Sequence, residues 1–256
     1  GAAKIVHNKK QLAIKVSMNS FFGGMGAEHG VYEMLRAAHS ITHVGRTTVQ
    51  AARDYADTLR SAPVVVGGRE VDALAVEEVE AKRSARTVPL TVYGDTDSIM
   101  VNMPPVPRGF LRALRADRAN PDLGILHPSS DQPATVPESL LFTEAVAEFI
   151  AAQLNASYRK PMELEFEEVA IQANFLQPKM YVKCLLEGIT DDDLRRLARN
   201  EPVGKFKAAG ISAVRRDRVA YARKLQGDVA KAIVMKHDEK RALQLIRRRL
   251  LRLALG

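Results

Sequence analysis

Residues 87–103 restrict the fold more than any other part of the chain. Two short runs of β-forming residues, 90–92 and 99–101, flank Tyr-Gly-Asp-Thr-Asp-Ser at positions 93–98. Two such runs around a Gly-Asp turn predict a β-hairpin that carries its acidic residues at the tip. The chain is therefore expected to contain an antiparallel sheet with this hairpin at its centre.

Asp95 and Asp97 are separated by one residue at the predicted tip. A turn breaks the strict alternation of a strand, so both carboxylates can face one divalent cation. Such oxygen ligands suit Mg²⁺, which takes few protein carboxylates and completes its shell with water and substrate phosphates. Aspartates are also ordinary turn residues, and taken alone the pair favours a purely structural interpretation.

The residues before the hairpin predict two long helices. Lys15, Asn19 and Phe22 fall at i, i+4 and i+7, so they share one face of a helix over residues 11–22, which a run of glycines is expected to end. A second helix is expected over residues 32–60, where apolar residues recur at helical spacing without a proline.

The remaining sequence predicts further strands and helices. Residues 162–171 alternate apolar and acidic side chains as a strand does, and a β-like run covers residues 179–186. A helix is expected over residues 137–155, and the chain beyond Thr190 is expected to be mostly helical. The predicted fold class is α+β, an antiparallel sheet with long helices packed on one face and a helical basic segment after it.

Two stretches are expected to be insertions. Residues 61–88 have no steady period, and residues 104–137 are rich in proline, with a short helix predicted over 110–118.

Charge is distributed unevenly along the chain. Residues 201–256 hold 15 Lys and Arg against 5 acidic residues, a net charge of +10, whereas the preceding 200 residues carry −2. A basic end beside a slightly acidic body suggests a surface that binds a polyanion, although a solvated helix surface would look the same. The one cysteine, Cys184, excludes an internal disulfide and favours a reducing compartment.

The hairpin sequence resembles the third conserved motif of B-family DNA polymerases, and it is most similar to the branch of cellular and large-DNA-virus enzymes. Further segments resemble motifs of the same family in the same order: residues 11–23, 38–46, 161–167, 178–181 and 210–217. Two departures stand out, because Phe22 replaces the usual tyrosine of the second motif and Pro178 replaces the first lysine of a K-K-x-Y motif. The resemblance covers nearly the whole stretch from residue 11 to residue 217.

The resemblance implies roles for the acidic residues. Asp97 is expected to be the direct Mg²⁺ ligand, and Asp95 is expected to act beside it as an electrostatic partner. Tyr93, Thr96 and Glu165 are auxiliary candidates at this site. The structural alternative for Glu165 is the wet face of a strand.

The resemblance also implies two binding surfaces. Lys15 is expected to neutralise the charge of a triphosphate, and Asn19 and Phe22 are expected to line the nucleotide pocket. The remaining candidates are expected to hold primer-template DNA through its phosphates and minor groove, and they are Lys179, Tyr181, Arg215 and Arg216.

The implied reaction is nucleotidyl transfer by a DNA-directed DNA polymerase, in which a primer 3′-hydroxyl attacks the α-phosphorus of a dNTP with two Mg²⁺ ions. The implied domains are the end of the fingers at 1–24, a palm at 25–204 and the start of a thumb at 205–256. The chain is expected to be part of a longer protein that works in a host nucleus or a cytoplasmic viral replication site. A processivity factor is expected to bind elsewhere, and the segment alone is expected to be inactive, because the family's first aspartate motif is not found.

Two other function classes remain open at this point. A polymerase-derived module could bind DNA or serve as a scaffold without catalysis, although the intact Asp97 argues against a decayed site. A basic amphipathic membrane binder rests only on leucines and arginines within residues 243–253, and packing of a thumb helix explains these equally well.

Overall fold

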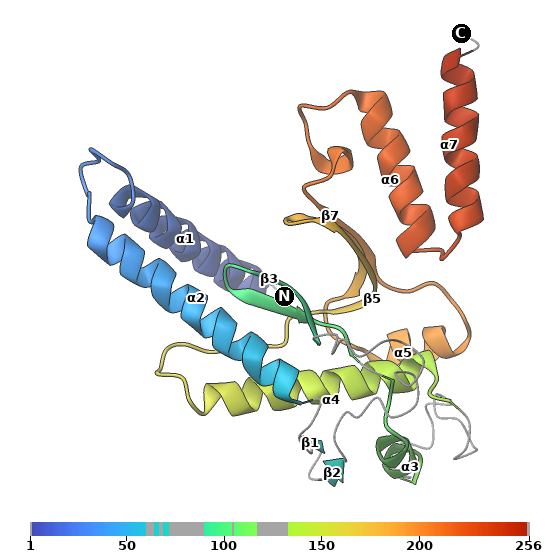
Figure 1. Cartoon of the computed structure of the whole chain (residues 1–256), viewed down its shortest axis with the longest axis horizontal. Helices are drawn as coiled ribbons and strands as arrows, with labels where there is room; N and C mark the ends of the chain where they lie inside the picture. Colours follow the sequence, from blue (N-terminus) through green and yellow to red (C-terminus); the bar gives the residue numbers. More distant parts are fainter. Residues whose placement is uncertain are drawn as a thin grey trace. The chain divides into compact units, whose positions relative to one another are not determined.

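The computed structural model describes residues 2–59, 64–66, 69–71, 90–103, 105–116 and 133–254. The chain forms two compact units (Figure 1): a hairpin unit of Gly1–Asp57 and Thr91–Val101, and a sheet unit of Thr58–Leu90 and Asn102–Gly256. Most of the expected insertion at 61–88 lies outside the described residues, apart from the short paired strands β1 (Val64–Val66) and β2 (Arg69–Val71). In the described ranges, no helix is long and apolar enough to cross a membrane.

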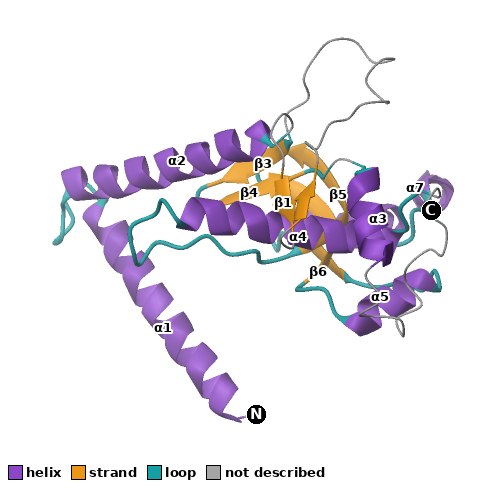
Figure 2. Ribbon diagram, turned by 90° about the horizontal axis from the view of Figure 1, so that it is seen from below, coloured by secondary structure: helices purple, strands orange, loops and turns teal. Residues whose placement is uncertain are grey.

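The hairpin unit begins with the two predicted helices, α1 (Ala2–Met25) and α2 (Leu35–Thr58). Figure 2 shows the two helices diverging from the turn that joins them, where the Met34 amide donates to the Met25 carbonyl at 2.9 Å. Gly23, Gly24 and Gly26 were expected to end the first helix; α1 runs through the first two and ends at Met25, directly before Gly26. A glycine costs a helix only about 1 kcal/mol relative to alanine, which flanking helical residues outweigh.

The predicted hairpin is present as β3 (Thr91–Asp95) and β4 (Ser98–Val101). Its base is joined to the end of α2, because the Thr91 amide donates to the Asp57 carboxylate at 3.0 Å. The expectation that this hairpin is the centre of a larger sheet is not met, since β3 and β4 form a sheet of two strands among the described residues.

The sheet unit contains three antiparallel strands in the order β5 (Val169–Gln177), β6 (Met180–Leu186) and β7 (Lys205–Ala209). The strand predicted over 162–171 was wrong in its start, because residues 162–168 join no ladder. The side chain of Asn155 instead holds the main chain of Leu164 through two hydrogen bonds, at 2.7 and 2.9 Å. This side-chain bridge replaces a neighbouring strand, so alternation alone could not locate the start.

The strand β7 was not predicted, and the segment 205–256 therefore begins with a strand of this sheet rather than with a helix. The helices that follow are α6 (Ala220–Val234) and α7 (Glu239–Ala254), which pack against each other. Two shorter helices complete the unit, α3 (Arg108–Ala116) within the proline-rich stretch and α5 (Asp191–Ala198) after β6.

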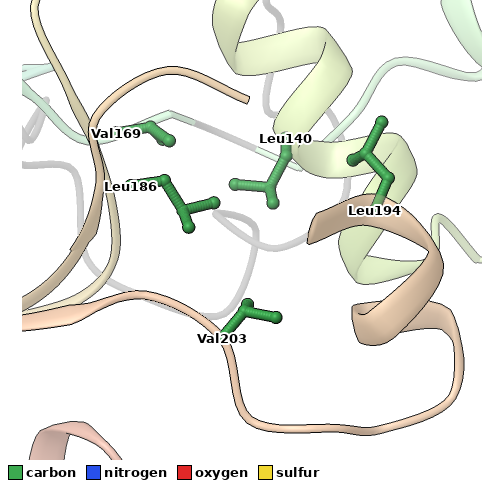
Figure 3. Close-up of a cluster of buried hydrophobic side chains, with 5 residues drawn as sticks. All are labelled: Leu140, Val169, Leu186, Leu194 and Val203. Carbon is green, nitrogen blue, oxygen red and sulfur yellow. The ribbon is translucent and has the colours of Figure 1, made fainter. Parts of the chain in front are cut away.

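One end of the sheet is buried under α4 (Val136–Asn155) and α5. Figure 3 shows the apolar side chains that converge there from helices, strands and the loop before β7: Leu140, Val169, Leu186, Leu194 and Val203. Burial of such side chains contributes about 1.5–3 kcal/mol each, which fixes the sheet against the helices.

The start of α4 is held by a buried charge pair. Thr135 and Glu138 form a capping box, and the guanidinium of Arg115 in α3 donates to both oxygens of the fully buried Glu138 carboxylate, at 2.8 and 2.9 Å. The hydrogen bonds that Arg115 donates to Glu138 raise the pKa of Arg115 above its ordinary value, although burial opposes this. A bidentate pair of this kind satisfies a charge that would otherwise be costly to bury.

A second apolar cluster packs α6 against one face of the sheet. It contains Val182, Cys184, Ile211, Ala230 and Val234. The opposite face of β6 carries Tyr181 and Lys183, which alternate with these apolar residues along the strand. The sheet therefore has one face packed against α6, and a second face on which Tyr181 lies beside the buried Lys183 and Leu185.

Candidate functional site

The tip of the hairpin is an acidic turn, defined by residues 95–98. Asp95 and Ser98 are cross-strand partners, and Thr96 and Asp97 form the two-residue turn between them. Thr96 has a φ of 50°, a left-handed value that is unusual for a β-branched residue. Such strain persists only where surrounding contacts enforce it, and it is commonly found at functional sites.

The two carboxylates of the acidic turn differ in their surroundings. Asp95 is half-buried, and its oxygens accept hydrogen bonds from the Tyr93 hydroxyl at 3.3 Å and the Thr96 hydroxyl at 3.0 Å. Asp97 is exposed, and its carboxylate makes no hydrogen bond or ion pair with any residue that the structure describes. One aspartate is therefore oriented by protein groups, and the other is open to a ligand.

The acidic turn can supply only some of the ligands that a divalent cation needs. No group of three or more His, Cys, Asp or Glu side chains that could hold a metal occurs among the described residues. The turn offers the oxygens of Asp97, with Asp95 beside it, and Mg²⁺ accepts such a small set of carboxylates when phosphates and water complete its shell.

The nucleotide-binding candidates all lie on α1. Lys15 and Asn19 are exposed, and Phe22 is half-buried one turn further along the helix. The helical spacing predicted for these three residues is confirmed, so they share one face of the helix. Neighbouring Phe21 packs instead against Tyr32, with the ring centroids 6.1 Å apart.

A second two-residue turn joins β5 to β6 in the sheet unit. This basic turn consists of residues 177–180, with Pro178 and Lys179 between the paired residues Gln177 and Met180. Lys179 has a φ of 62° and an exposed side chain. Proline fixes φ at the first position of the turn, and the lysine accepts the left-handed second position.

Gly210, which follows β7, packs closely against the basic turn. A Cβ atom placed on Gly210 would lie 2.2 Å from the Lys179 carbonyl oxygen, and its φ of 65° is left-handed. Tyr181 is the cross-strand partner of Ala209, immediately before this glycine. The structure thus brings two predicted DNA-binding segments, 178–181 and 210–217, to the same end of the sheet.

The two arginine candidates differ in their availability. Arg215 donates through Nε and Nη2 to both carboxylate oxygens of Asp217, each at 3.1 Å. These hydrogen bonds lower the pKa of Asp217 below its ordinary value. Arg216 is exposed and makes no ion pair or hydrogen bond with the described residues. Arg216 is thus the better placed of the two for an outside phosphate.

Glu165 lies on the extended segment before β5, and its side chain is exposed. The acidic turn belongs to the hairpin unit and Glu165 to the sheet unit. Its expected contribution to the metal site therefore stays a prediction.

Sequence reasoning missed a charged cluster beside Tyr181. Lys183 of β6 is 2% exposed and forms an ion pair with Glu168, whose second oxygen accepts from Lys207 of β7 at 3.1 Å. The signal was present as oppositely charged residues on neighbouring runs, but their pairing depends on the strand register, which a single sequence does not reveal.

Comparison with known proteins identifies relatives of the chain. Residues 1–107 match the model of DNA polymerase family B, and this stretch contains α1, α2 and the acidic turn. The DNA polymerase of Guinea pig cytomegalovirus is 28% identical over 179 residues, which are 70% of this chain and 13% of the viral protein.

Two other relatives extend the similarity. The DNA polymerase delta catalytic subunit of Schizosaccharomyces pombe is 25% identical over 214 residues, 84% of this chain and 14% of the yeast protein. A putative DNA polymerase of Frog virus 3 is 26% identical over 239 residues, 92% of this chain and 17% of the viral protein. The chain spans roughly one seventh of the length of these relatives.

Proposed function

Because the chain is a relative of the family B DNA polymerases, viral enzymes among them, we propose that it is a segment of the catalytic core of a DNA-dependent DNA polymerase. In the proposed reaction the 3′-hydroxyl of a primer attacks the α-phosphorus of a dNTP. The new phosphodiester bond forms as the bond to pyrophosphate breaks, and the primer is extended by one deoxynucleotide.

The contrast between Asp95 and Asp97 is the observation that carries this proposal. Both lie in the stretch that matches the family, and only Asp97 presents a carboxylate without a protein partner among the described residues. Asp97 would hold Mg²⁺, which when bound stabilises the charge on the attacking and leaving oxygens. Asp95, held by Tyr93 and Thr96, would add negative charge beside the metal and keep the turn in shape.

The face of α1 supports a role in binding the incoming nucleotide. Lys15 supplies an exposed point charge for the triphosphate, and Asn19 lies one helical turn further on. Phe22 would exclude a ribose 2′-hydroxyl by the bulk of its ring. It has no hydroxyl of its own, so this selection would rest on shape alone.

The basic turn supports a role in holding the primer. Lys179 and Tyr181 would contact the sugar-phosphate backbone and the minor groove, where a protein can sense a duplex with little regard to its sequence. Arg216 would add a phosphate contact from the neighbouring segment. These contacts make affinity for DNA depend on salt, because each neutralised phosphate releases counterions.

Primer extension by the full-length protein tests the proposal. Asp97→Ala should lower incorporation by about a thousandfold or more, since several kcal/mol of transition-state stabilisation would be lost. Binding of primer-template DNA should persist, because it rests on other residues. Incorporation within about tenfold of the wild-type rate would contradict the assignment of Asp97, since a lost metal ligand costs more than that.

A further inference from the structure

Strand β6 buries a lysine in the middle of the sheet. The side chain of Lys183 is 3% exposed, and its ammonium is paired with the Glu168 carboxylate, whose own side chain is 20% exposed. Removing a charge from water costs several kcal/mol, and a buried ion pair often contributes little net stability. An apolar residue would fill this position at lower cost, so stability alone does not explain the lysine.

Glu168 joins two lysines on adjacent strands. Lys183 and Lys207 are cross-strand partners, and like charges in such a position repel each other. Glu168 binds both ammonium groups, with 3.1 Å to Lys207. Burial acts to raise the pKa of Glu168, but the hydrogen bonds and charges of the two lysines outweigh it and lower that pKa. The carboxylate is therefore held in its charged form, and it fixes the ammonium of Lys183.

The fixed ammonium lies beside Tyr181. These two residues are separated by one position on β6 and share a face of the sheet, with Lys183 Nζ 5.1 Å from the centroid of the tyrosine ring. Phe175 of β5 is the cross-strand partner of Tyr181, and the two ring centroids are 6.0 Å apart at an interplanar angle of 54°. A cation and an aromatic ring at these distances both attract the ring of Tyr181.

We propose that Lys183, held by Glu168, is a positioning residue that fixes the ring of Tyr181 for its contact with a primer phosphate, an inference that rests on the proposed role of Tyr181. Lys183 is too deeply buried to reach a phosphate, whereas Lys207 is exposed. Lys183 would therefore affect DNA binding only through Tyr181. A ring that is ordered before DNA arrives loses less conformational freedom on binding, which strengthens the contact.

Lys183→Met provides the test, because methionine keeps the length of the side chain and removes its charge. Glu168 keeps its pair with Lys207 in this variant, so no buried carboxylate is left alone. Lys205→Met is the matched control. It also removes one lysine from this sheet, but its ion pair with Glu187 at 2.7 Å is exposed and lies away from Tyr181.

The dissociation constant of a fluorescent primer-template is measured for the full-length protein at several salt concentrations. Lys183→Met should raise this constant about fivefold, the upper size expected for loss of a cation–π contact at a partly exposed ring. The slope of log K against log salt should stay unchanged, because no phosphate contact is removed. Lys205→Met should change the constant by less than about twofold, as is usual for an exposed ion pair.

A double-mutant cycle with Tyr181→Phe separates positioning from a direct or purely structural role. The phenylalanine variant lacks the hydroxyl that needs to be positioned, so adding Lys183→Met to it should have little further effect. Full additivity, or a salt slope that falls by about one unit, would overturn the proposal, because Lys183 would then act independently of Tyr181.

Two further results keep the test decisive. If Tyr181→Phe and Tyr181→Ala both bind DNA as the wild type does, the proposed role of Tyr181 fails and the positioning role fails with it. If Tyr181→Ala weakens binding while Lys183→Met does not, only the positioning role fails. Lys183→Gln, which lacks the charge but can still hydrogen-bond to Glu168, replaces Lys183→Met if urea unfolding shows that the methionine variant is not folded.

Discussion

The acidic turn and the basic turn have the same length but different backbones, since the left-handed residue is the first of the two turn residues in one and the second in the other, and their chemical settings are opposite. Each is a two-residue turn between antiparallel strands, and each has a non-glycine residue in a left-handed conformation, Thr96 in one and Lys179 in the other. Asp97 of the acidic turn is exposed, whereas the Lys179 carbonyl of the basic turn packs closely against Gly210. Under the proposed function, we expect a ligand to complete the acidic turn, whereas contacts within the protein already fix the basic turn.

Gly210→Ala is expected to have the largest effect on this comparison. The new Cβ would clash with the Lys179 carbonyl oxygen, and the alanine would also have to adopt the left-handed conformation of Gly210. We therefore expect the free energy of unfolding to fall by about 3 kcal/mol or more. Gly188→Ala is the matched control, since Gly188 has a φ of 92° with no atom within 4 Å of a placed Cβ. It should lose only about 1 kcal/mol from backbone strain, measured by urea unfolding. Equal losses would show that Gly210 supports no turn.

Asp95→Ala tests the ranking within the acidic turn. Its carboxylate already accepts two hydrogen bonds from side chains, so we expect it to shape the turn rather than to bind the metal. Single-nucleotide incorporation should fall about a hundredfold, less than for Asp97→Ala, because only an indirect electrostatic contribution is lost. An equal loss at both positions would show that the two carboxylates share one role.

Phe22→Ala tests the proposal that the hairpin unit discriminates between deoxyribose and ribose in the incoming nucleotide. Removing the ring should raise ribonucleotide incorporation relative to deoxynucleotide incorporation by about tenfold to a hundredfold, because the side chain that excludes the 2′-hydroxyl is lost. The kcat/KM values for a matched pair of nucleotides provide the measurement. Phe21→Ala is the control, because Phe21 packs against Tyr32. Unchanged discrimination in Phe22→Ala would place the sugar selection elsewhere.

The arginines near the basic turn give the smallest expected effect. Arg216→Ala should weaken DNA binding a few-fold and lower the salt slope by about one unit, because its guanidinium, which pairs with none of the residues that the structure describes, would bind one phosphate. Arg215→Ala should change the slope less, since its guanidinium is bound to Asp217. A larger change for Arg215 would mean that DNA displaces Asp217.

The sequence predicted the parts of the fold that are encoded locally. The acidic turn, α2 and α4 follow from short-range patterns, namely a Gly-Asp turn, helical spacing and a proline at a helix start. The start of β5 and the existence of β7 did not follow. The first depends on Asn155, which supplies hydrogen bonds that a strand would otherwise make, and the second depends on pairing with β6.

The same distinction applies to the candidate site. Asp95, Asp97, Lys179 and Tyr181 became candidates because their segments resemble motifs of the family B DNA polymerases, whereas the spacing of the two aspartates alone favoured a structural interpretation. The unequal surroundings of the two aspartates depend on the orientation of two nearby side chains, since the hydroxyls of Tyr93 on the same strand and of the adjacent Thr96 both donate to Asp95. The contact between Lys183 and Tyr181 likewise needs Glu168 to be brought to β6 by the folded chain. Motif resemblance therefore identified the candidates, and three-dimensional contacts show how the surroundings of these residues differ.

The central claim, that chemistry belongs to the acidic turn and DNA binding to the basic turn, is tested most directly by one titration. The dissociation constant of a fluorescent primer-template is measured for the full-length protein, its Asp97→Ala variant and its Lys179→Ala variant. Asp97→Ala should bind within about twofold of the wild type, while Lys179→Ala should bind about tenfold more weakly with a salt slope lower by about one unit. Equal weakening by both substitutions, or none by Lys179→Ala, would contradict the claim.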